Sequence, residues 1–125
     1  MDRYLVDLRN MQRGRLDWRT VLNLGRLPES WRLGGIPDLP VVLTQSVIRK
    51  VTRDHGVTWD QLRMLQTAIH RPIAIFETQP GARVALTEMN VPDGDVVVAV
   101  HMGATQQNQV INDIRSIHNV RSLAA

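Results

Sequence analysis

The feature that most constrains the fold is a change of hydrophobic period at Pro72. Before it, residues 44–56 and 58–70 carry apolar side chains at the spacing of two amphipathic helices. After it, three runs rich in Val, Ile, Ala and Phe are separated only by QPGA and NVPDG, which have the Pro and Gly chemistry of hairpin turns. Strands joined by such short turns pair as an antiparallel meander. The three runs span residues 72–78, 83–89 and 95–102.

The closing segment, residues 110–120, fits two periods. Its apolar residues can share one helical face, whereas its β-branched content fits a strand. We favour a fourth strand, because a meander followed by a loop of this length usually closes with another pairing. In a strand, Ser116 and His118 point to one face and Arg115 to the other, so Arg115 and His118 would act together only across a bend or bulge. The sequence therefore predicts an α+β fold, with N-terminal helices packed on an antiparallel meander sheet of about four strands.

Helix ends are marked by capping residues. Thr44 and Thr58 precede the two apolar helical patterns as N-caps, and Gly56 ends the first as a C′ residue. Upstream, residues 1–27 look like a helical arm or cap, with a first helix through Tyr4 and Leu8 and a second short helix capped by Asp17. We expect this arm to precede one compact domain over residues 28–125.

Composition narrows the function classes. The chain has 125 residues, no cysteine and no run of eighteen apolar residues, which excludes disulfides, thiolate metal sites and a cysteine nucleophile and argues against a membrane protein. Net charge is +3, and Lys50 is the only lysine among fifteen cations. Arginine suits phosphate recognition, so a polyanionic partner fits this bias, although GC-rich coding sequence would produce the same bias.

Recognised catalytic motifs are absent from the sequence. It has no Gly-rich phosphate loop, no HExxH and no Gly-x-Ser-x-Gly, and its four histidines stand too far apart for a sequence-level metal motif. We expect neither a metal nor a cofactor.

The remaining chemistry suffices for RNA cleavage without a metal. The 2′-hydroxyl attacks its own phosphodiester, so the protein must accept one proton, donate another and stabilise the charge on the phosphorane. Histidine can take either proton role near neutral pH, and Arg, Lys or Ser can hold the phosphate. The candidate catalytic residues are His118, His101, Ser116 and Arg115, and the candidate substrate-binding residues are Lys50, His55, Arg121 and Arg49.

Each candidate has a structural alternative. His101 can be a structural histidine at a strand end, and the cations near the end of the 44–56 helix can simply complement its dipole. The chain as a whole can instead be a non-catalytic module that binds nucleic acid or protein. Five aromatic side chains among Phe, Tyr and Trp are too few for an extended base-stacking platform.

The succession of segments is similar to a known family. A Leu-Gly-x-x-Pro opening, Pro-Asp-Leu-Pro before a helix, Arg-Lys then His55, the Pro-Ile-Ala-Ile-Phe strand and a closing Ile-x-Ser-Ile resemble the C-terminal domain of phage MuF-type head proteins and related polymorphic toxins. That domain is grouped with the barnase, EndoU, colicin E and RelE-like nucleases. The resemblance covers about residues 22–121 and implies helices on an antiparallel sheet, with ribonuclease activity used as an effector.

The resemblance also implies roles and partners. Lys50 and His55 match a Lys and a His around the first helix, Ser116 matches a Ser of the last strand, and His118 stands where a Tyr is expected. The implied substrate is RNA, including tRNA, and the implied protein partners are an immunity protein or antitoxin, or a larger parent protein. We expect action in the cytoplasm after delivery by a phage or as a secreted toxin, and exposed sheet edges that allow a homodimer.

Overall fold

The computed structural model shows helices packed on one mixed sheet. It describes residues 2–27, 40–79, 82–92, 94–106 and 110–120. The elements in chain order are α1 (Arg3–Gln12), β1 (Leu22–Arg26), β2 (Pro40–Leu43), α3 (Gln45–Asp54), α4 (Trp59–Ala68), β3 (Ala74–Gln79), β4 (Ala82–Val91), β5 (Gly94–Gln106) and β6 (Val110–Val120).

The sheet has six strands in the order β1-β2-β6-β5-β4-β3. Strands β3 to β6 form the expected antiparallel meander, which confirms the α+β class and the choice of a strand for residues 110–120. The expected count of about four strands is low, because β1 and β2 extend the sheet beyond β6. The β2–β6 pairing is parallel, through Val41 with Asn112 and Val42 with Asp113.

The expected second helix of the N-terminal segment is wrong. Residues 22–26 form β1, in which Leu22 and Leu24 are buried and Asn23 between them is exposed. This two-residue alternation is satisfied by antiparallel pairing with β2. Asp17 instead closes a turn, where its carboxylate accepts a hydrogen bond from the Arg19 backbone N–H at 2.8 Å.

The helix boundaries follow the predicted capping chemistry. The Thr44 hydroxyl accepts from the Val47 N–H at the start of α3. At the start of α4, Thr58 and Gln61 form a reciprocal capping box, in which each side chain accepts the backbone N–H of the other. Gly56 follows α3 with φ +67°, a conformation that glycine adopts without the steric cost of a Cβ. These three predictions are confirmed.

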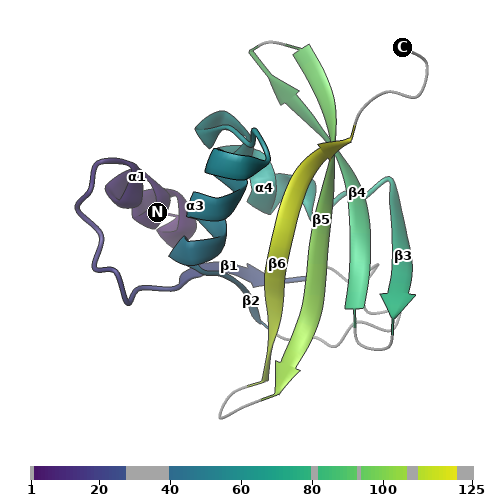
Figure 1. Cartoon of the computed structure of the whole chain (residues 1–125), viewed down its shortest axis with the longest axis horizontal. Helices are drawn as coiled ribbons and strands as arrows, with labels where there is room; N and C mark the ends of the chain where they lie inside the picture. Colours follow the sequence, from purple (N-terminus) through teal and green to yellow (C-terminus); the bar gives the residue numbers. More distant parts are fainter. Residues whose placement is uncertain (1, 28–39, 80–81, 93, 107–109, 121–125) are drawn as a thin grey trace.

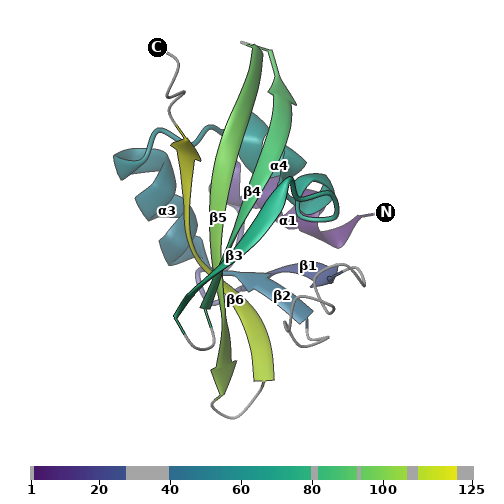
Figure 2. The same ribbon diagram turned by 90° about the vertical axis from the view of Figure 1, so that its right-hand side faces the viewer.

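The helices lie on one side of strands β3 to β6 (Figure 1), and Figure 2 looks onto the opposite side of the sheet. Alternate residues of β5, Val98, Val100 and Met102, belong to the buried core under the helices. The Tyr4 hydroxyl donates to the Leu62 carbonyl at 2.6 Å and so ties α1 to α4. None of the described helices is long and apolar enough to cross a membrane.

Candidate functional site

Two histidines meet on the sheet face that points away from the helices, which we call the open face. In the β5–β6 pairing, His101 lies opposite Ser116 and Ala99 lies opposite His118. Their neighbour Ile117 is buried in the core, so these four side chains point to the other side of the sheet. The rings of His101 and His118 are tilted by 35° with their centroids 4.8 Å apart. The structure therefore brings together three of the four predicted catalytic residues.

Arg115 joins them because β6 carries a bulge. His101 pairs with Ser116, but the next residue of β5, Met102, pairs with Ile114. Arg115 is consequently the extra residue, and the bulge allows Ile114 and Ile117, three positions apart, both to enter the core. The simple alternation that would direct Arg115 to the helix side is thus interrupted at this residue.

The Arg115 guanidinium occupies the space in front of Gly103. Strand β5 alternates regularly, so Gly103 faces the open side because Met102 faces the core. A methyl group built on Gly103 would lie 2.5 Å from Nη2 and 2.7 Å from Nη1 of Arg115. The guanidinium therefore packs flat over the glycine, on the same face as His101 and Ser116. Sequence reasoning did not single out Gly103, whose only signal is a glycine that continues an apolar strand without forming a turn.

His55 reaches the same region from the end of α3. Its Nδ1 lies 2.9 Å from the Ile117 carbonyl oxygen. Because a carbonyl oxygen only accepts, Nδ1 carries the hydrogen, and in the neutral ring Nε2 keeps the lone pair. The Ser116 hydroxyl is 3.5 Å from the same Nδ1 and cannot donate to it, so the pair is not an activated serine nucleophile. The rings of His55 and His118 are edge-to-face at 6.4 Å.

The electrostatics of the site follow from partial burial and crowding. Burial lowers the pKa of His101 below its ordinary value, and protonated His118 and His55 would lower it further. This lowered pKa favours the neutral form of His101. Beside it, burial raises the pKa of Asp113, and the Arg115 guanidinium partly offsets that effect.

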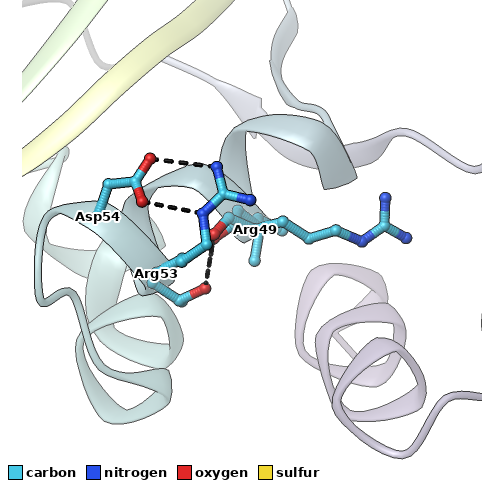
Figure 3. Close-up of polar contacts among 5 residues, drawn as sticks. Arg49, Arg53 and Asp54 are labelled. Carbon is cyan, nitrogen blue, oxygen red and sulfur yellow. Dashed lines mark hydrogen bonds and ion pairs between the residues drawn. The ribbon is translucent and has the colours of Figure 1, made fainter.

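Arg49 and Lys50 lie elsewhere on α3. They line a groove on its exposed flank together with Ser46, Arg53 and Asp54, and no histidine is among the residues that line it. Figure 3 shows the Arg53 guanidinium facing the Asp54 carboxylate, with Nε to Oδ1 at 2.9 Å, while Arg49 extends away from this pair. The hydrogen bond from Arg53, with a smaller electrostatic contribution from Arg53, His55 and Lys50, lowers the pKa of Asp54. Arg121 lies outside the described residues.

The cluster of His55, His101, Arg115, Ser116 and His118, which we call the histidine cluster, combines proton-transfer groups with a cation and a hydroxyl. Such a set can accept a proton, donate a proton and hold an anionic oxygen. Within the described ranges, no group of three or more His, Cys, Asp or Glu side chains is arranged to hold a metal ion.

Comparison with known protein families identifies the family of the C-terminal part of the chain. A family model described as the phage MuF C-terminal domain matches residues 46–124, well over half of the chain. This segment includes all five residues of the histidine cluster. No curated protein and no solved structure matches the chain.

Proposed function

The chain belongs to the phage MuF C-terminal domain family, and we propose that it acts there as a metal-independent ribonuclease, a toxin or phage effector whose site is the histidine cluster. One observation carries the proposal: the imidazoles of His101 and His118 lie 4.8 Å apart on the open face, next to a fixed guanidinium. Two adjacent imidazoles beside a guanidinium can both reach one phosphodiester bound over their ring edges.

The reaction needs two proton transfers. One group removes the proton of the ribose 2′-hydroxyl as its oxygen attacks phosphorus, and a second protonates the departing 5′-oxygen. His101 suits the first role, because its lowered pKa keeps it neutral and able to accept a proton. His118, the adjacent imidazole, takes the second. The products of this reaction are a 2′,3′-cyclic phosphate and a free 5′-hydroxyl.

Arg115 and Ser116 stabilise the negative charge on the phosphorane. A guanidinium presents several N–H donors in one plane and matches two phosphate oxygens at once. Ser116 lies directly opposite His101 in the β5–β6 pairing, so its hydroxyl can hydrogen-bond a phosphate oxygen that lies over the open face beside His101. His55, oriented by the Ile117 carbonyl, adds a third imidazole at the edge of β6.

The proposed substrate is RNA, with tRNA as one form of it. The proposed setting is the cytoplasm of a target cell, after delivery by a phage or as a secreted toxin. An immunity protein or antitoxin would bind over the open face to block it, and a larger parent protein would carry the domain. No cofactor enters the proposed reaction.

The experiment compares wild type with His118→Ala on total RNA and tRNA in the presence of EDTA. We expect cleavage that survives EDTA, leaves 2′,3′-cyclic phosphate ends and falls at least about a hundredfold in the variant, the usual scale for one general acid or base. His70→Ala is the matched control, because His70 is an exposed histidine outside the cluster. Equal loss in both variants would point to damage of the fold rather than to catalysis.

Intact RNA with the wild-type protein would contradict the ribonuclease proposal. The second candidate, a binding module, then predicts RNA retention that weakens steeply with salt because phosphate contacts release counterions. Salt-insensitive behaviour would point instead to a protein partner.

A further inference from the structure

We propose that Phe76 forms a nucleobase-binding position on the open face, beside the site of phosphate cleavage. The inference rests on the proposed ribonuclease function and assigns part of its substrate recognition. It also identifies the substrate class as RNA with an unpaired base next to the reacting phosphate, since a base inside a duplex could not stack on a protein ring.

Register places Phe76 in line with the histidine cluster. Phe76 of β3 lies opposite Val84 of β4, Val84 lies opposite His101 of β5, and His101 lies opposite Ser116. Residues directly opposite each other share a face, so all of them are on the open face. Two strand spacings of about 4.8 Å separate the backbones of Phe76 and His101, roughly 10 Å in all. A nucleoside attached to the reacting phosphate can span that distance.

Exposure distinguishes Phe76 from its neighbours in the row. Its side chain is 53% exposed, whereas Val84 beside it is only 9% exposed and forms a floor between the ring and His101. A half-exposed ring next to a buried apolar side chain can stack on a base without a rearrangement of the core. Aromatic side chains bind single-stranded bases in this way, and the interaction tolerates any base.

The charge near Phe76 favours a nucleic acid, rather than an apolar protein surface, as the ligand of this position. At the other end of the row lie Arg115 and the three imidazoles of the histidine cluster. One continuous face therefore offers a guanidinium and imidazole nitrogens at one end and an aromatic ring at the other. A nucleotide has the complementary arrangement, with an anionic phosphate at one end and a flat, weakly polar base at the other.

The test measures binding of short 2′-O-methyl RNA, which cannot be cleaved because its nucleophile is blocked. Phe76→Ala should weaken binding about 5- to 150-fold, the range that corresponds to loss of one stacked base. Binding of the same oligomer made with abasic riboses should be equal for variant and wild type. Phe76→Tyr keeps the ring and should bind like wild type. Ile73→Ala is the matched control, since Ile73 is 58% exposed but precedes β3 and lies outside the row of paired residues that runs from Phe76 to Ser116.

Failure of this inference is separable from failure of the proposed function. Wild-type cleavage of ordinary RNA with no effect of Phe76→Ala on binding would overturn the base position and leave the ribonuclease intact. If Phe76→Ala weakens binding of abasic and base-bearing oligomers equally, the base position is also overturned. Base-dependent binding without any cleavage would support the position while refuting catalysis. If the wild-type protein binds no RNA, both fail, and sedimentation of wild type and Phe76→Ala would then show whether the ring joins two copies of the chain.

Discussion

Substitution of Gly103 by alanine tests the position of Arg115 without removing its charge. The new methyl group would occupy the space of the guanidinium, 2.5 Å from Nη2 and 2.7 Å from Nη1. Ordinary contacts between such atoms begin near 3.5 Å, so the guanidinium must move by about 1 Å or more. It can do so because it is the end of a flexible side chain. Gly103→Ala therefore displaces the charge while the strand stays intact.

The expected effects on stability and rate differ. Alanine gives the unfolded chain less conformational entropy than glycine does, so less entropy is lost on folding. This stabilises the folded protein by about 0.4–1 kcal/mol and offsets the cost of displacing the end of the arginine side chain. We expect the free energy of unfolding to change by less than about 1 kcal/mol. A misplacement of about 1 Å in a catalytic group can reduce the rate about a hundredfold. We expect kcat/KM for RNA cleavage to fall by roughly that factor.

A double-mutant cycle with Arg115→Ala isolates the contact. Removal of the guanidinium should lower kcat/KM by about a hundred- to a thousandfold, as for one charge-stabilising donor. In that background, Gly103→Ala meets no guanidinium, so it should leave the rate unchanged and raise stability by about 0.4–1 kcal/mol. Cleavage rates and urea denaturation of wild type, the two single variants and the double variant give the interaction free energy between the two positions in catalysis and in stability.

Two results would refute this reasoning. Independent, additive losses from Gly103→Ala and Arg115→Ala would mean that the methyl group acts through something other than the guanidinium. Normal cleavage by both single variants would remove Arg115 from the mechanism altogether.

Two further predictions concern stability. His101 has a lowered pKa in the folded protein, so below the ordinary histidine pKa of about 6.5 the unfolded chain binds more protons than the folded one, and the free energy of unfolding should fall as the pH drops. Urea denaturation between pH 7.5 and 5.5 should show a smaller loss of stability for His101→Asn than for wild type, and an equal loss would disprove the assignment. Gln45 is buried and its Nε2 donates to the carbonyls of Asp17 at 2.7 Å and Thr20 at 2.9 Å. Gln45→Ala should therefore cost about 1–3 kcal/mol, whereas the neighbouring exposed Ser46→Ala should cost less than about 0.5 kcal/mol, and equal costs would show that these bonds contribute little.

The elements that could be predicted are those defined by nearby residues. The α3 and α4 caps at Thr44 and Thr58 and the meander after Pro72 depend on signals within a few positions of each other, and each is present. Strand β1 was missed because Leu22 and Leu24 alternate over too short a span to outweigh a helical pattern. Its identity comes from pairing with β2, on the far side of residues 28–39. Such pairing is a property of two segments, and neither one specifies it alone.

The candidate site was predictable in composition but not in geometry. Ser116 and His118 share a face because of simple strand alternation, which the sequence shows, whereas His101 joins them through the register of β5 with β6. Arg115 shares that face only because the register shifts between His101 and Met102, and register depends on how two strands align. His55 joins through a hydrogen bond to Ile117, 62 positions away, which no local pattern encodes.

Residues outside the matched family segment also shape the site. The match begins at residue 46, after β2, yet β2 pairs in parallel with β6 at Asn112 and Asp113. Two residues after Asp113, β6 carries the extra residue Arg115, and beyond it the Ile117 carbonyl accepts a hydrogen bond from His55. Only Thr44 separates the end of β2 from the start of α3, so the parallel pairing of β2 with β6 constrains where α3, and the His55 that follows it, lie along β6. The strand before the matched segment thus contributes to the position of His55.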